Sequence, residues 1–182
     1  KPSVKDDEVL VRVISASLNA SDFEFLTGSP LYTRMWGLFK PKIKILGSDI
    51  SGYVENVGKN VTKFKRGDKV FGDIFETWGG LAEFVSVPEN KLAIKPEFIS
   101  FEEAAAIPQA SLVSLQGLIT KTSLQPGQKV LINGAGGGAG SFAIQIAKTF
   151  GAEVTGVDSE IKLDFLRELG ADQAFDYIKT DF

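Results

Sequence analysis

A run of small residues, Gly134-Ala135-Gly136-Gly137-Gly138-Ala139-Gly140, is the part of the chain best suited to bind an anion. Such small side chains let a phosphate reach backbone N–H groups, and a helix starting there adds free donors and a partial positive charge. The pattern predicts an apolar strand over 129–133 before the run and a helix over 141–150 after it. We expect a dinucleotide pyrophosphate to bind through Gly134, Ala135, Gly137, Gly138, Ala139 and Gly140.

Two other interpretations of this run fit less well. A flexible glycine linker would not be flanked by a strand and a helix of suitable length. A nucleoside triphosphate loop ends in Gly-Lys-Ser or Gly-Lys-Thr, whereas Ser141 and Phe142 follow Gly140 here. The run therefore favours a dinucleotide.

Asp158 stands 18 positions after Gly140, at the end of a second predicted strand over 153–157. A carboxylate there accepts hydrogen bonds from the adenosine ribose, which favours NADH, and it repels the 2′-phosphate of NADPH. Asp158 also fits as the N-cap of a helix starting at Glu160. Lys162 could reach a 2′-phosphate instead, or it is an ordinary surface lysine.

The elements that must position these residues change character along the chain. Residues 129–182 predict strand, helix, strand, helix and strand, which is the first half of a Rossmann (doubly wound parallel sheet) domain. Residues 1–100 predict short strands with frequent glycine and proline turns, which favours a small β-barrel or sandwich. Helices are expected over 101–107 and 109–122. We therefore expect an α/β protein with one domain over 1–100 and another over 101–182.

The composition excludes several chemistries. The chain has no cysteine and no histidine, so disulfides, zinc–cysteine sites, iron–sulfur clusters, thiol catalysis and Ser-His-Asp triads are excluded within it. Net charge is −3, and the nine Lys or Arg against three Asp or Glu over 34–69 fit a solvated face better than a nucleic-acid or phosphate patch. No run approaches the roughly 18 apolar residues of a membrane helix. We expect a cytoplasmic protein without nucleic-acid or membrane partners.

Several short stretches of the chain together resemble one known family. They resemble the medium-chain dehydrogenase/reductase superfamily, and in particular its zinc-free quinone oxidoreductase (zeta-crystallin-like) branch. The resemblance implies that residues 1–100 form a GroES-like barrel domain. The supporting stretches are 18–22, 45–52, 57–58, 64–70, 80–84, 104–108 and 130–140.

The resemblance also implies that this chain binds no zinc. Zinc-dependent relatives carry a cysteine at the position of Asn19, and Gly-His-Glu at the positions of Gly47, Ser48 and Asp49. Neither ligand is kept, and the four-cysteine lobe of those relatives is missing. A zinc alcohol dehydrogenase, which uses the metal as a Lewis acid, is therefore disfavoured.

The implied activity is hydride transfer from NADPH or NADH to a quinone or an activated alkene. The branch commonly prefers NADPH whereas Asp158 favours NADH, so the cofactor stays open. Asn19 and Asp22 would lie near the nicotinamide, although they also fit as a turn pair that caps the next segment. Val113 stands where relatives often have a threonine, and the tyrosine that many carry after Asn-x-x-Asp is replaced by Phe23, Glu24 or Phe25. An enoyl reductase and a non-catalytic nucleotide-binding protein remain alternatives.

The chain resembles part of a longer enzyme. A doubly wound domain has about six strands, of which three are predicted here, and the opening strand of the barrel is also missing. We expect a parent about twice as long, for which the resemblance implies a homodimer, and little cofactor binding or activity from the fragment alone. The small-molecule acceptor would meet an apolar wall, unless the same side chains merely fill the barrel end. These side chains are Phe23, Phe25, Leu31, Tyr32, Trp36 and Phe39.

Overall fold

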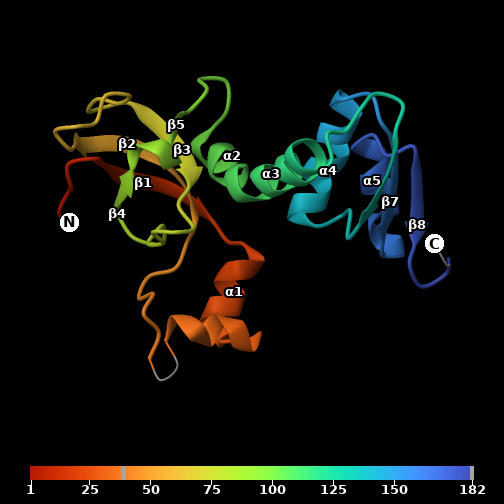
Figure 1. Ribbon diagram of the computed structural model, residues 1–182, viewed down its shortest axis with the longest axis horizontal. Helices are drawn as coiled ribbons and strands as arrows, with labels where there is room; N and C mark the ends of the chain where they lie inside the picture. Colours follow the sequence, from red (N-terminus) through yellow and green to blue (C-terminus); the bar gives the residue numbers. More distant parts are fainter. Residues whose placement is uncertain (38–39, 181–182) are drawn as a thin grey trace. The chain divides into compact units, whose positions relative to one another are not determined.

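The computed structural model describes residues 1–37 and 40–180, except for the side chain of Trp36. The chain forms two compact units, Lys1–Gln109 and Ala110–Phe182. The helix α2 (Phe101–Ala106) packs against strands of the first unit, so that unit extends nine residues beyond the boundary expected at residue 100. Figure 1 labels the helices and strands of both units.

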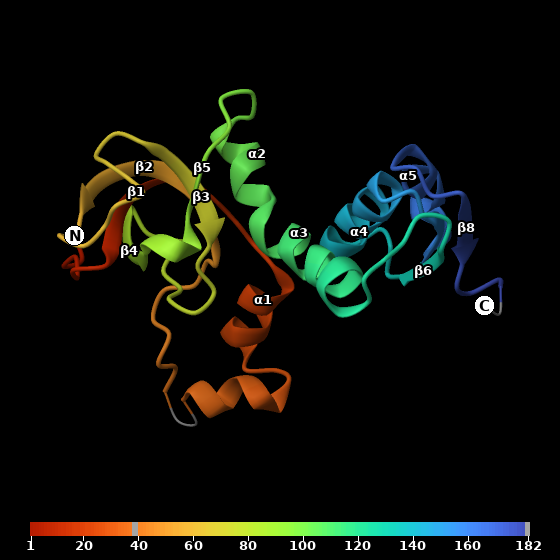
Figure 2. The same cartoon turned by 45° about the horizontal axis from the view of Figure 1, so that its top comes forward.

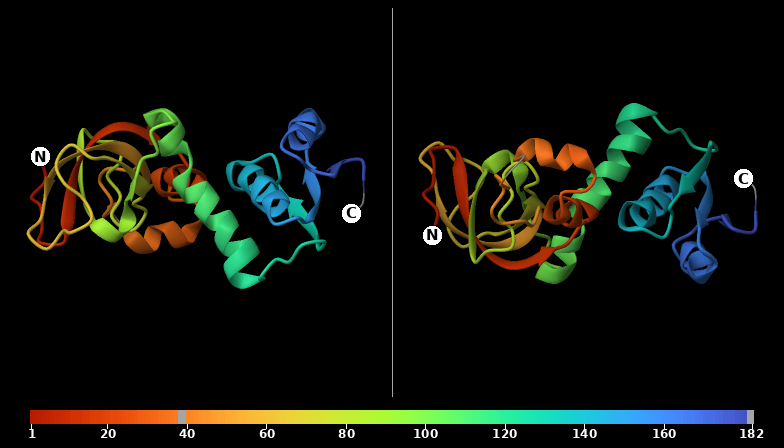
Figure 3. Two further views of the ribbon diagram at one scale, coloured as in Figure 1. Left: turned by 90° about the horizontal axis from the view of Figure 1, so that it is seen from above. Right: turned by 90° about the horizontal axis from the view of Figure 1, so that it is seen from below.

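The first unit is built on an antiparallel sheet with the strand order β4-β1-β2-β3-β5. The valines at alternate positions of the first strand, Val9 and Val11, are fully buried in its core, as period-two patterning requires. In both views of Figure 3 these strands curve around one another, as in a small barrel. The strands are β1 (Glu8–Ser17), β2 (Asp49–Val57), β3 (Lys69–Asp73), β4 (Phe84–Pro88) and β5 (Ala93–Ile94), and the 3₁₀ turn η2 spans Glu89–Lys91.

Two helical segments of this unit were not predicted as helices. They are α1 (Ala20–Thr27) and the 3₁₀ helix η1 (Leu31–Trp36), which Figure 2 shows set off from the strands. α1 has Asn19 as its N-cap and ends at Gly28, whose φ of 67° is the left-handed conformation that favours glycine. Asn19 therefore caps the helix that follows it, as the alternative interpretation of the Asn19–Asp22 pair predicted.

The predicted capping box before α2 is present. The Ser100 hydroxyl accepts from the Glu103 N–H at 3.0 Å, and a Glu103 carboxylate oxygen accepts from the Ser100 N–H at 2.7 Å. Pro108 begins α3 (Pro108–Leu115), in keeping with the preference of proline for the first helical turn. The helix expected to continue to residue 122 changes at Gln116 into the π-helix η3 (Gln116–Lys121).

The second unit carries the predicted order of parallel strands and helices. Its strands β6, β7 and β8 pair in parallel in that order, and both crossovers are helical. The helix after the glycine run begins at Gly138 rather than at Ser141, so the end of the run is the first turn of that helix. The elements are β6 (Lys129–Asn133), α4 (Gly138–Thr149), β7 (Glu153–Asp158), η4 (Glu160–Lys162), α5 (Leu163–Glu168) and β8 (Gln173–Asp176).

A helix that crosses a lipid bilayer must be both long and apolar. Within residues 1–37 and 40–180, no helix is both long and apolar enough to span one.

Candidate functional site

The glycine loop between β6 and α4 uses its first amides to hold itself together. The N–H groups of Gly134 and Ala135 both donate to the Val157 carbonyl, at 2.9 and 3.1 Å, and Gly137 N–H donates to the Gly134 carbonyl at 3.0 Å. Ala135 is fully buried. Ala135 therefore joins the loop to β7, and the expected contact of its amide with a phosphate would require breaking this bond.

The donors left over are at the start of α4. The first-turn amides of a helix have no partner inside the helix, which here means those of Gly138, Ala139 and Gly140. Gly138 and Ala139 are exposed. The partial positive charge of the helix end adds to these donors, so an anion is bound best at this position.

The glycines of the loop are there for different reasons. A Cβ on Gly140 would lie 2.4 Å from the Gly134 carbonyl oxygen and 2.6 Å from the Ala135 Cα, so α4 can pack on the loop only without a side chain. A Cβ on Gly138 would meet only the Ala110 side chain, at 3.8 Å. Packing thus requires glycine at position 140 but not at position 138. The uncovered backbone at Gly138 would instead let a phosphate approach closely. The loop fits a dinucleotide pyrophosphate.

Asp158, at the carboxyl end of β7, is tied into this loop. One of its carboxylate oxygens accepts from the Gly136 N–H at 2.8 Å, and the other accepts from the Ser159 N–H at 2.8 Å and lies 3.4 Å from the Lys162 ammonium. Burial raises the pKa of this carboxyl, but the hydrogen bonds and Lys162 outweigh burial and hold the pKa below its ordinary value. Asp158 is therefore a charged brace of the loop.

The C-terminal part of α3 supports the same loop from another direction. The buried Ser114 hydroxyl contacts two carbonyl oxygens, those of Ala110 at 2.9 Å and of Ala139 at 2.6 Å. Val113, the predicted pocket residue of this helix, is 57% exposed. Its side chain is available to a ligand, whereas Ser114 fixes the backbone beside it.

Asn19 and Asp22 are brought together in the first unit. The Asn19 N–H donates to one carboxylate oxygen of Asp22 at 2.8 Å, and the buried Gly47 N–H donates to the other at 2.7 Å. Asp22 is 4% exposed. It therefore acts as a clamp between the start of α1 and the loop before β2, while the Asn19 side chain stays half-buried.

Asp49 is a site residue that sequence reasoning noted only as a departure from a zinc ligand. It is fully buried and accepts from Asn19 Nδ2 at 3.1 Å, Ser17 Oγ at 3.3 Å and the Gln109 N–H at 3.0 Å. Burial, with a smaller contribution from the neighbouring Asp73 carboxylate, raises its pKa to about 6 against these hydrogen bonds. The carboxyl thus titrates near neutrality and anchors the backbone where α3 begins.

The cluster around Asp49 does not fit a zinc centre. Asn19 Nδ2 lies 3.1 Å from Asp49 and 3.4 Å from Ser48 Oγ, so the three positions do converge. Their donor set is an amide, a hydroxyl and one carboxylate, whereas protein zinc sites use thiolate, imidazole and carboxylate groups. In the described part of the chain, no cluster of three or more such ligand residues occurs.

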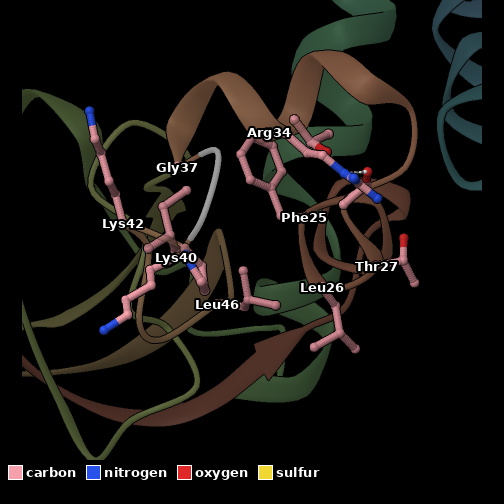
Figure 4. Close-up of a pocket in the computed structure, with 12 residues that line it drawn as sticks. Phe25, Leu26, Thr27, Arg34, Gly37, Lys40, Lys42 and Leu46 are labelled. Carbon is pink, nitrogen blue, oxygen red and sulfur yellow. Dashed lines mark hydrogen bonds between the residues drawn. The ribbon is translucent and has the colours of Figure 1, made fainter.

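Two adjoining hollows lie in the first unit, with volumes of about 240 and 560 Å³. Phe25, Lys42 and Ile43 line both. Figure 4 shows Phe25 pointing into the smaller hollow, with the ammonium groups of Lys40 and Lys42 at its periphery.

The predicted apolar wall is present only in part. Phe25 lines the hollows, but Phe23 and Leu31 are 68% and 73% exposed and line neither of them. Tyr32 is also exposed, and its hydroxyl donates to the Glu24 carboxylate at 2.5 Å. The Trp36 side chain and Phe39 lie outside the described residues.

Phe75 and Trp78, which sequence reasoning missed, complete the wall of the larger hollow. They lie some 50 positions after Phe25, and no periodic pattern links them to it.

Comparison with known proteins agrees with this architecture. Residues 5–97 match the alcohol dehydrogenase GroES-like domain, and residues 138–182 match the family described as zinc-binding dehydrogenase. The chain is 40% identical to a 2-methylene-furan-3-one reductase of Solanum lycopersicum, covering 100% of this chain and 47% of that protein. It is 37% identical to a chloroplastic NADPH-dependent alkenal/one oxidoreductase of Arabidopsis thaliana, covering 99% of this chain and 47% of the relative.

A solved structure shows the same fold. The quinone oxidoreductase from Coxiella burnetii superposes with a TM-score of 0.91 at 34% identity, covering 100% of this chain and 57% of that one. The chain spans about half the length of the curated relatives it matches. With its GroES-like first unit and its partial Rossmann second unit, the chain belongs to the medium-chain dehydrogenase/reductase superfamily, in the quinone oxidoreductase branch.

Proposed function

We propose that the protein containing this chain reduces a quinone or an α,β-unsaturated ketone with NADPH or NADH, without zinc. The observation that carries the proposal is the glycine loop, whose first-turn amides at Gly138, Ala139 and Gly140 have no partner within α4 and can bind an anion while Asp158 braces the loop. The names of the relatives, a furanone reductase, an alkenal/one oxidoreductase and a quinone oxidoreductase, support the acceptor class.

A dihydronicotinamide cofactor, when bound, would supply a hydride, which carries two electrons, to an electrophilic carbon of the acceptor. The displaced electron pair moves to the carbonyl oxygen of the acceptor, which takes a proton from water. Such acceptors need little acid–base assistance, so the main work of the protein is to bind and orient both reactants. We assign pyrophosphate binding to the start of α4 and a contact with the nicotinamide to the exposed Val113 side chain, both within the second unit.

For the cofactor we propose NADPH. Both oxygens of Asp158 already accept hydrogen bonds from protein groups, and the Lys162 ammonium 3.4 Å away offsets the carboxylate charge. The Lys162 ammonium can then bind the 2′-phosphate of NADPH. Without Lys162, the Asp158 carboxylate at the same place would favour the free ribose hydroxyl of NADH. The name of the Arabidopsis relative states NADPH dependence and supports this choice.

The cofactor proposal is tested with Lys162→Met, which keeps the apolar stem. We expect the KM for NADPH to rise about tenfold and that for NADH to stay within about twofold. A matched control is Lys148→Met, because Lys148 pairs with Asp172 at 2.8 Å on the same unit. Equal changes for both cofactors would contradict a role for Lys162 at the 2′-phosphate.

The activity is tested on the full-length protein by following oxidation of NADPH and NADH with para-benzoquinone, an α,β-unsaturated ketone and an enoyl thioester. We expect the protein to turn over the quinone and the unsaturated ketone, and we expect a metal chelator not to inhibit this turnover. Preference for the thioester would favour the enoyl reductase alternative. Tight cofactor binding without turnover of any acceptor would favour a nucleotide-binding protein. The same assay on residues 1–182 tests the expectation that this part alone has little activity.

We also propose that the full-length protein is cytoplasmic and forms a homodimer. Cell fractionation tests the location, which matters because the Arabidopsis relative is named chloroplastic. Light scattering on the full-length protein tests the dimer. Retention of nucleic acid or lipid vesicles by the purified protein would contradict the expectation that its partner is a small molecule only.

A further inference from the structure

The larger hollow of the first unit has walls from two distant segments. One wall is residues 75–79, which follow β3, and the other is residues 42–45, which precede β2. Phe25 of α1 contributes a third side. Its volume of about 560 Å³ is within the range of small-molecule sites.

Hydrogen bonds fix the wall that follows β3. The fully buried Ile74 donates its N–H to the Ser48 carbonyl at 2.6 Å, and its own carbonyl accepts from Thr77 and Trp78 at 2.8 and 2.7 Å. Trp78 has a φ of 59°, a left-handed conformation that a bulky residue rarely adopts. Backbone strain of this kind persists where the surroundings hold it, and it is concentrated at ligand sites.

The two walls are also joined to each other. The Gly80 N–H donates to the Gly47 carbonyl and the Leu81 N–H to the Leu46 carbonyl, both at 2.9 Å. A Cβ on Gly47 would lie 2.6 Å from the Leu81 nitrogen, so the segments touch backbone to backbone. The hollow is therefore a preformed feature of this unit.

Three aromatic rings form its inner surface. Phe25 lies 4.9 Å from Trp78 and 6.2 Å from Phe75, and the Phe75 and Trp78 rings are 5.0 Å apart, measured between centroids. Tilted and edge-to-face arrangements at these distances are the favoured geometry of aromatic clusters. Phe75 is 37% exposed, so part of this aromatic surface faces the open space.

The rim carries positive charge. Lys42 and Lys44 line the hollow, and neither forms an ion pair with any residue the structure describes. The acidic lining residue Glu76 is paired with Lys91 at 2.8 Å, which offsets its charge. An aromatic interior with an uncompensated cationic rim is complementary to a flat apolar molecule that carries an acidic group.

We propose that this hollow binds a planar conjugated ring bearing an anionic substituent, such as a carboxylated or sulfonated quinone or aryl enone. The inference rests on the proposed function in one respect, since it names such a compound as the acceptor. Phe75 and Trp78 contact the ring, and Lys42 and Lys44 attract the anionic group.

Binding is measured by calorimetry on the full-length protein, without nicotinamide cofactor, using a sulfonated naphthoquinone and the unsubstituted naphthoquinone. The sulfonated compound should bind about threefold to tenfold more tightly at low salt, and the difference should shrink at high salt because salt screens exposed charges.

Variants separate the two contributions. Lys42→Ala with Lys44→Ala should abolish the preference for the sulfonated compound. Lys63→Ala with Lys65→Ala, an equal charge change at exposed lysines away from this hollow, should retain it. Phe75→Leu, at a partly exposed position that the fold tolerates, should weaken binding of both compounds about fivefold. Trp78→Phe should have a smaller effect in the same direction.

Unchanged binding in Phe75→Leu, or equal effects of the two lysine pairs, would overturn the proposal. Because binding is measured without turnover, its result is independent of the proposed reaction. If the protein turned over quinones but did not bind them in this hollow, only the proposed binding site would be contradicted. Binding here with no turnover of any acceptor would remove the proposed reaction and leave the site standing.

Discussion

The two units each contain a buried carboxylate at the centre of a polar cluster, and the pKa values of the two are shifted in opposite directions. Asp49 is fully buried, its hydrogen-bond donors are neutral, and Asp73 is nearby, so its pKa rises to about 6. Asp158 is 8% exposed and has two backbone N–H donors and Lys162 beside it, so its pKa is lowered. Hydrogen bonds alone thus do not keep a buried carboxylate acidic here. The deeper burial of Asp49 raises its pKa despite its hydrogen bonds, whereas at Asp158 the backbone N–H donors together with Lys162 outweigh burial.

The clusters also differ in what holds them. The glycine loop is packed tightly backbone against backbone at Gly140, whereas the Asp49 cluster depends on a side-chain carboxylate that accepts hydrogen bonds from Ser17, Asn19 and the Gln109 backbone. Backbone packing leaves no room for an added atom, so the largest effect of a small change is expected in the loop.

Gly140→Ala should give that largest effect. Its Cβ would overlap backbone atoms of Gly134 and Ala135, and neither can swing away as a flexible side chain would. We expect a loss of about 3 kcal/mol or more in the free energy of unfolding, with loss of measurable NADPH binding. Chemical denaturation and calorimetry measure the two.

Gly138→Ala is the matched control, since its Cβ would come no closer than 3.8 Å to another residue. It should fold normally and lose only cofactor affinity. Equal destabilisation by both substitutions would contradict the distinction between the two glycines.

Asp49 should make stability depend on pH. Its pKa near 6 in the folded state exceeds the ordinary 3.8, so the folded state holds a proton more tightly and unfolding releases it. The contribution of Asp49 to stability should therefore be greatest below about pH 4 and fall by up to about 3 kcal/mol as pH rises through about 6. The measurement is the difference in denaturation free energy between wild type and Asp49→Asn across this range. A difference that stays constant with pH would show that Asp49 does not titrate there.

Asp22→Ala should be less costly. It leaves the buried Gly47 N–H without its acceptor and frees the Asn19 N–H, so we expect a loss of about 2 kcal/mol in the free energy of unfolding. Asp22→Asn keeps one acceptor oxygen and should lose about half as much. If both variants were as stable as wild type, Asp22 would not clamp the two loops.

Lys162→Met should have the smallest effect on stability and should sharpen the contrast between the carboxylates. Without the ammonium, the lowered pKa of Asp158 should move upward, as measured by carboxyl NMR. A lowered pKa contributes stability that is lost as pH falls through the folded-state value, so the variant should lose less stability in acid than wild type. The titration of Asp49, which lies in the other unit, should not change.

The sequence was informative where structure depends on local pattern. The apolar strand β6, the glycine run, the helix α4 and Asp158 at the end of β7 follow one another in the predicted order. Their periodicity and turn residues lie within a few positions of each other, so the dinucleotide-binding half of the fold was predictable. The phosphate contacts themselves remain a prediction.

Tertiary structure decided the rest. The local signals for α1 are confined to its ends, at Asn19 and Gly28, and its one buried residue, Asp22, accepts one of its hydrogen bonds from Gly47, 25 positions later. The raised pKa of Asp49 arises from burial and from Asp73 on a neighbouring strand. The aromatic hollow needs Phe25 and Trp78, which meet only when β3 ends beside α1. A sequence pattern shows the propensity and periodicity of one segment. Burial, the proximity of charges and cavities each depend on several segments that only folding brings together.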